Sequence, residues 1–129
     1  HLNLAHEVIE PAVTGFLTLS QGGTPTRVDR FLMFHDHAAS FPWRSQAAWI
    51  ARQLGADATG IGRAKQCFRT DLYRENLGPI GADLPGASEK IEGTIREETA
   101  VASSRGQMIL APDAFFDGRT FDFAATSGE

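Results

Sequence analysis

The segment from 40 to 55 constrains the fold most, because it has the signals of a helix with both ends marked. Ser40 and Pro42 suit a helix start, since serine caps free backbone N–H groups and proline is tolerated in the first turn. Apolar side chains then recur at the spacing of one helical face, at Trp43, Ala47, Ile50 and Leu54. Gly55 is the residue type that commonly follows a helix end. The sequence therefore predicts a helix over 40–54, with Trp43 on its buried face.

Further helices are predicted on either side of this one. Asn3 can cap a first helix, which Pro11 limits to a short helix and one further turn ending at Gly15. A helical segment is expected around 61–68, and another from Thr70 to the Gly-Pro pair at 78–79. Helices therefore dominate the prediction.

Strand signals are fewer. Val28–Phe34 is short and rich in large apolar residues, which predicts a strand. The aromatic residues on either side of Asp117-Gly118 predict a hairpin over 114–123. The charged stretch 88–102 has a narrow apolar stripe of Ile91 and Ile95, so it is expected to form a surface helix or a mobile excursion, with Glu89–Glu98 as a solvated face. The predicted fold class is mixed, helix-rich α/β.

Size and charge exclude several classes of protein. A chain of 129 residues with 42% hydrophobic residues is ordinary for one globular domain, and no internal boundary is evident. The net charge of -4 and the scattered basic residues argue against binding of nucleic acid. Cys67 is the one cysteine of the sequence, so no internal disulfide forms and the compartment stays open. No apolar run is long enough to cross a bilayer.

Candidate site residues are few. His35 and His37 alternate around Asp36 and could share a cation, but a structural zinc site needs four ligands, so a hydrogen-bonded loop is preferred. Arg44 could face an anion at the start of its helix, where unpaired N–H groups favour negative charge, although an exposed or salt-bridge role is preferred. No catalytic group, metal site or cofactor motif is expected, and the aromatic residues are assigned to packing rather than to ligand stacking.

Five segments, taken in order, resemble one protein family. They are Ala12-Val13-Thr14-Gly15, Ser40-Phe41-Pro42-Trp43-Arg44-Ser45, Arg69-Thr70-Asp71-Leu72-Tyr73-Arg74, Ser104-Arg105-Gly106 and Phe115 to Asp122. Together with the helix after Ser45, they are similar to the C-terminal part of the nitrate-, nitrite- and bicarbonate-binding proteins of bacterial ABC importers. They also resemble the cytoplasmic nitrate sensors built on the same scaffold.

The resemblance implies a fold and a function. Residues 1–129 would form a single domain or a fragment of a larger two-lobed solute-binding protein with a type 2 periplasmic-binding-protein fold. The parent would bind a small inorganic anion in its cleft, mostly through residues in the earlier part of its chain, and would not be an enzyme. Its partner would be an ABC transporter permease in the periplasm or, alternatively, a regulatory protein in the cytoplasm. A severed fragment would expose apolar surface, so a homo-oligomer is expected, in which the 115–123 hairpin is exchanged between copies or covers that surface.

Overall fold

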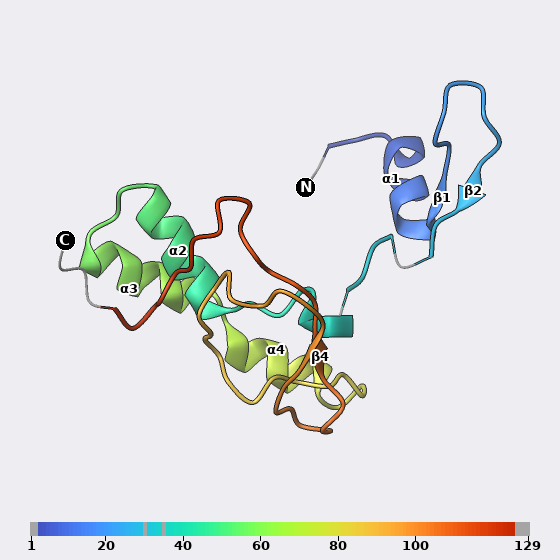
Figure 1. Cartoon of the computed structure of the whole chain (residues 1–129). Coiled ribbons are helices and arrows are strands. Elements are labelled where there is room, and N and C mark those ends of the chain that lie inside the picture. Colours follow the sequence, from blue (N-terminus) through green and yellow to red (C-terminus); the bar gives the residue numbers. More distant parts are fainter. Residues whose placement is uncertain (1–2, 30, 35, 126–129) are drawn as a thin grey trace. The chain divides into compact units, whose positions relative to one another are not determined.

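The computed structural model describes residues 3–29, 31–34 and 36–125. The chain divides into two compact units, an N-terminal unit (His1–Phe34) and a C-terminal unit (His35–Glu129). Helices and two small antiparallel sheets make it a mixed, helix-rich α/β protein (Figure 1). The predicted fold class is therefore confirmed at this level.

The N-terminal unit contains one helix and one small sheet. Helix α1 (His6–Thr14) includes Pro11 and ends at Gly15, whose φ of 77° and N–H bond to the Pro11 carbonyl give the predicted left-handed end. The predicted Asn3 cap is wrong: the N-cap is Ala5, and Asn3 has a φ of 46°, outside the extended conformation that a capping residue needs.

The sheet of this unit lies before the segment predicted as a strand. Strands β1 (Phe16–Leu17) and β2 (Thr26–Arg27) pair antiparallel, with Phe16 opposite Arg27. The predicted strand Val28–Phe34 is wrong, because its described residues form turns and bends. The Val28 N–H still bonds to the Gly15 carbonyl at 2.8 Å, beside β1, but the pairing of strands ends at Arg27, and Phe31 and Phe34 are exposed.

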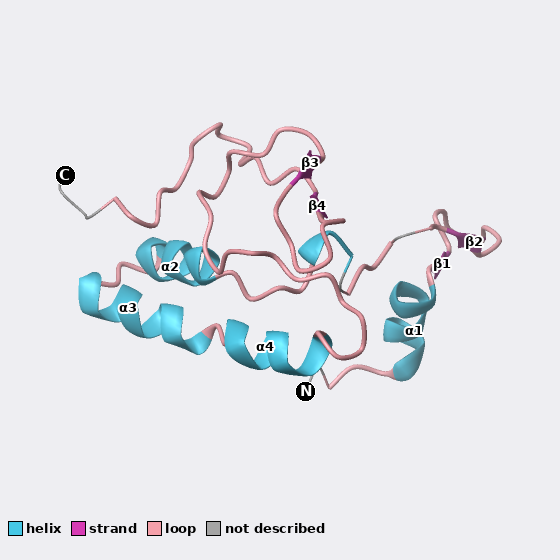
Figure 2. Ribbon diagram, turned by 90° about the horizontal axis from the view of Figure 1, so that it is seen from below, coloured by secondary structure: helices cyan, strands magenta, loops and turns pink. Residues whose placement is uncertain are grey.

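The C-terminal unit begins with a short 3₁₀ turn, η1 (Asp36–Ala38), and contains α2 (Arg44–Gln53), α3 (Ala58–Cys67) and α4 (Thr70–Leu77). Helix α2 packs beside α3, and Figure 2 shows α3 and α4 following one another in a row. The predicted helices at 61–68 and 70–77 are confirmed, and α4 begins at Thr70 with Arg69 as its N-cap.

Helix α2 begins later than predicted. Its N-cap is Trp43 rather than Ser40, because a residue before proline is disfavoured in helical conformation and Phe41 instead turns into the core, where it is 2% exposed. The helix end was predicted correctly, since Gly55 has a φ of 78°. Trp43 is buried as predicted, but Ile50 and Leu54 are 43% and 82% exposed. Small residues form the buried face of α2 instead: Ser45, Ala47, Ala48 and Ala51.

Loops and short bridges form most of the chain after α4. Strands β3 (Thr99–Ala100) and β4 (Ile109–Leu110) pair antiparallel. Of the two alternatives predicted for 88–102, the surface helix is wrong, because Glu92 pairs through its backbone with Phe121 and the next residue, Gly93, has a φ of 83°. The predicted hairpin is also wrong. The turn is present, with the Gly118 N–H bonded to the Phe115 carbonyl at 3.0 Å, but Phe121 pairs with Glu92 instead of with the other arm.

The core of the C-terminal unit joins segments that are distant in sequence. One cluster of its buried apolar residues consists of Ala38, Phe41, Trp43, Met108 and Leu110. The Phe41 ring meets Trp43 and Tyr73 edge to face, with centroids 4.8 and 5.2 Å apart. The turn before α2, helix α4 and strand β4 are therefore held together by one cluster of side chains.

Candidate functional site

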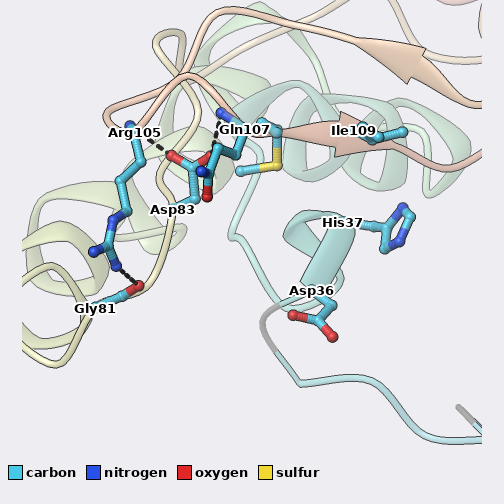
Figure 3. A pocket seen from close by; sticks show the side chains of 8 residues that line it. Asp36, His37, Gly81, Asp83, Arg105, Gln107 and Ile109 are labelled. Atoms are coloured by element: carbon cyan, nitrogen blue, oxygen red, sulfur yellow. Dashed lines mark hydrogen bonds between the residues drawn. The ribbon is translucent and has the colours of Figure 1, made fainter.

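A polar hollow of about 290 Å³ lies where η1, the loop after α4 and the approach to β4 meet (Figure 3). Its lining residues are Asp36, His37, Gly81, Asp83, Arg105, Gln107, Met108 and Ile109. The hollow combines two carboxylates with one guanidinium and one imidazole. His37, a candidate site residue from the sequence, lies here beside other ionisable side chains.

Asp83 organises one wall of this hollow. Its carboxylate accepts hydrogen bonds from the Ser103 hydroxyl and the Arg105 N–H at 2.8 Å, the Gln107 N–H at 3.1 Å and the Ser104 hydroxyl at 3.2 Å. Desolvation by burial raises the pKa of Asp83, but the hydrogen bonds together outweigh it and hold that pKa below its ordinary value. A carboxylate has about four acceptor positions, so these four donors saturate it.

Because all acceptor positions of its carboxylate are occupied by the chain, Asp83 has a structural role. The four donors belong to the loop 103–107, so the carboxylate fastens this loop onto the segment after α4. Arg105 adds a second tie, since its Nη1 donates to the Gly81 carbonyl at 2.5 Å. The carboxylate of Asp83 is therefore bound by the chain itself, which leaves little of its capacity for a metal ion or a substrate.

His37 enters the hollow from a strained backbone. His37 and Ala38 both have a φ of 56°, in the left-handed region that costs non-glycine residues energy. This conformation lets Ala38 turn into the core while His37 stays half-buried. Figure 3 shows Asp36 and His37 on η1, across the hollow from Asp83 and Arg105. The charged groups of the two walls therefore do not converge on one point.

The other predicted site residues lie elsewhere. His35 falls outside the described residues. Arg44 is half-buried and donates from Nε to the Lys65 carbonyl at 3.3 Å, which ties α2 to α3. The Arg44 N–H, at the start of α2, donates to the Ser88 carbonyl at 3.0 Å, so the chain already occupies this position. Within 3–29, 31–34 and 36–125, no group of three His, Cys, Asp or Glu side chains could hold a metal ion.

A buried polar cluster was missed from the sequence. The Ser45 hydroxyl donates to Glu92 Oε1 at 2.6 Å and accepts the Lys90 N–H at 3.1 Å. Lys90 Nζ forms ion pairs with Glu92, at 2.5 Å, and with Asp113. Ser45 and Glu92 are 0% and 3% exposed, so the assignment of 89–98 to a solvated face is wrong at Glu92.

The chemistry of this cluster is structural. Its hydroxyl is inaccessible to a substrate, and the Lys90 ammonium is shared between two carboxylates. The cluster joins α2 to two loops, around 90–92 and 113. One sequence signal was available, since Lys90 and Glu92 alternate around an apolar residue as they would in an extended segment with a buried side.

Comparison with known proteins gives no match, since no protein-family model, curated protein or solved structure is significantly similar to this chain. In the part of the chain that the structure describes, every helix is too short or too polar to cross a bilayer.

Proposed function

We propose that this chain is the C-terminal part of an ABC-importer solute-binding protein that captures nitrate, nitrite or bicarbonate in the periplasm. One observation carries the proposal: two segments of the sequence resemblance, 40–45 and 69–74, meet in a single packed cluster. In this view the chain is the supporting scaffold of a type 2 periplasmic-binding-protein fold, and the anion site lies in the earlier part of the parent.

The contacts between these two segments use the residue types that carry the resemblance. The Ser40 hydroxyl and the Tyr73 hydroxyl lie 3.2 Å apart, and the Phe41 ring packs on Tyr73. The Arg74 guanidinium lies over the Phe41 ring at 5.1 Å. It also donates to the carbonyls of Pro85 and Ala87 at 2.6 and 2.9 Å. Packing therefore accounts for the serine, phenylalanine, tyrosine and arginine at these positions.

The later segments of the resemblance are also structural. The backbone of Arg105 is held by Asp83, while Phe115 stacks on Trp49 with centroids 5.1 Å apart and Phe121 is buried. A scaffold whose characteristic residues are used in packing supports the proposal that the anion contacts lie outside it.

The test uses the whole reading frame that contains this chain. Isothermal titration calorimetry on the parent should give saturable binding of at least one of nitrate, nitrite and bicarbonate, whereas the present chain should give no heat above background. A parent that binds none of the three anions would contradict the proposal. Sub-millimolar binding to the present chain would contradict the location of the site.

Two variants of the parent test where the anion site lies. His37→Gln and Arg44→Gln should leave the anion affinity unchanged, because the first residue lies in a hollow whose charges do not converge and the second ties α2 to α3. A tenfold loss in either variant would place the anion site in this part of the chain. The alternative function, a cytoplasmic nitrate or nitrite sensor that binds a regulatory protein, is distinguished by the absence of a secretory or lipoprotein signal at the start of the parent.

A further inference from the structure

An aromatic and arginine-rich surface lies on the outer side of α2. We call it the aromatic surface and define it by Trp49, Arg52, Phe115, Phe116, Arg119 and Phe121. A hollow of about 420 Å³ runs through it, and Figure 1 shows the C-terminal segment that supplies its last four residues passing beside α2. Trp, Phe and Arg are the residue types enriched in protein interfaces and among the residues that dominate binding energy.

The floor of this surface is formed by ring contacts. Trp49 and Phe115 stack at 5.1 Å with an interplanar angle of 16°. The guanidinium of Arg52 lies 5.8 Å from the centre of the buried Phe121 ring. These contacts anchor the C-terminal segment to α2, so the hollow is formed within one folded unit.

Phe116 projects from the same surface. Its side chain is fully exposed, at 104% of the reference area, and it lies in the turn closed by the Gly118 N–H bond to the Phe115 carbonyl. A second bond, from the Arg119 N–H to the Asp117 carboxylate at 3.0 Å, continues this turn. An aromatic side chain held in water by a hydrogen-bonded turn is already ordered for insertion into a partner.

We propose that a second copy of this chain binds to the aromatic surface, with Phe116 of each copy inserted into the hollow of the other. A projection and a hollow on one surface are the requirement for a two-fold interface, in which the same patch serves both copies. The inference concerns this chain alone and does not depend on the proposed function. It replaces exchange of a 115–123 hairpin, which the structure does not contain.

Charge complementarity favours a second copy over a partner whose charges are all of one sign. Arg52 and Arg119 of this surface line the hollow together with Asp117, which is next to the projecting Phe116. Within one copy, Asp117 Oδ2 lies 3.7 Å from Arg119 Nε, and both side chains are exposed. Insertion of Phe116 carries Asp117 of one copy to the rim where the arginines of the other copy lie. In the dimer, the exposed ion pair within each copy is exchanged for pairs between copies. The two-fold relation makes this pairing twice, and we assign Asp117 and Arg119 to it.

Sedimentation equilibrium over a dilution series of the full chain tests the proposal, with a reductant present because Cys67 is exposed. The expected result is a monomer–dimer equilibrium that Phe116→Ala weakens at least tenfold. Ile80→Ala is the matched control, because Ile80 is 77% exposed and lies outside the aromatic surface. Both variants should keep the wild-type denaturation midpoint, since neither side chain is buried.

Charge reversal tests the pairing independently. Arg119→Glu and Asp117→Lys should each dimerise at least fivefold more weakly than wild type, because each places like charges together at both contacts. A mixture of the two variants should form a heterodimer, in which both contacts again join opposite charges.

Three results would overturn the proposal. The first is a monomer at every concentration, and the second is a dimer that Phe116→Ala does not weaken. The third is a dimer that Val8→Glu on α1 abolishes while Phe116→Ala leaves it intact, since this would place the interface on the N-terminal unit. Failure of the heterodimer to form would overturn the assigned pairing of Asp117 with Arg119.

Discussion

The two units of the chain contain similar apolar residues but use them differently. In the N-terminal unit none of the described apolar side chains is buried; Val8, Leu19 and Phe34 are 63%, 71% and 60% exposed. In the C-terminal unit, Phe41 and Trp43 are 2% and 5% exposed. Both units have a helix and a two-stranded sheet, so local secondary structure is not what separates them.

The difference lies in the sequence separation of the contacts. The core of the C-terminal unit joins Phe41 and Trp43 to Tyr73 and to Leu110, so burial and chain closure support one another. The N-terminal unit has a nine-residue helix with an internal proline and a two-residue strand pair. A segment of 34 residues is below the size at which chains usually sustain a core of their own, and isolated helices this short are marginal in water. Cooperative stability therefore belongs to the C-terminal unit.

Trp43→Ala should have the largest effect. Removal of a buried tryptophan costs about 3 to 5 kcal/mol, a large part of the stability of a domain. Urea denaturation should show a sharp fall in the midpoint or loss of a cooperative transition. Ile50→Ala on the same helix is the control and should lose far less, because Ile50 is 43% exposed. An unchanged midpoint for Trp43→Ala would refute the assigned core.

Lys90→Met should cause the next largest loss of stability. It leaves Glu92 and Asp113 facing one another without their shared cation, and removal of one partner from a buried ion pair costs about 3 to 5 kcal/mol. Lys90 retains 16% exposure, so we expect the lower end of that range. Arg69→Met breaks the exposed pair with Asp71 and should cost far less, because water screens the attraction between exposed charges. Equal losses in the two variants would argue against a buried cluster.

Asp83→Asn should destabilise the C-terminal unit by about 1 to 3 kcal/mol, because an amide cannot accept all four hydrogen bonds. The pKa of Asp83 is held below its ordinary value of 3.8, so its stabilising effect is complete above that value and is lost as the pH falls through the lower, folded-state pKa. Denaturation at a series of pH values should show the wild type and the variant converging in acid. A gap independent of pH would contradict the role of the ionised carboxylate.

Val8→Asn on α1 should have the smallest effect, within about 0.5 kcal/mol, since Val8 is exposed and surface changes of this kind are usually near neutral. The same urea titration measures it. A loss comparable to that of Asp83→Asn would show that α1 is part of the cooperative structure and would remove the contrast between the units.

The sequence correctly predicted the features that depend on residues close to one another along the chain. The ends of α1 and α2 follow from Gly15 and Gly55, whose positive φ values suit glycine, and α4 lies where its helix formers and the Gly-Pro pair placed it. The start of α2 was missed because Phe41 is needed in a core formed by residues far along the chain.

The polar clusters could not be predicted from the sequence for the same reason. Glu92 is buried only because Ser45 and Lys90 meet it, and Asp83 is saturated by a loop that begins 20 residues later. The candidates chosen by residue type, His37 and Arg44, lie in different places, because residue type alone carries no information on which segments meet.

Hydrogen exchange on the full chain tests the central contrast most directly. Amide protons in α2 should exchange only through cooperative unfolding of the C-terminal unit, whereas those in α1 should exchange close to the rates of an unstructured peptide. Trp43→Ala should then remove the protection of α2 and leave the exchange of α1 unchanged. Protection of α1 equal to that of α2 in the wild type would contradict the account, because it would mean that both units share one cooperative structure.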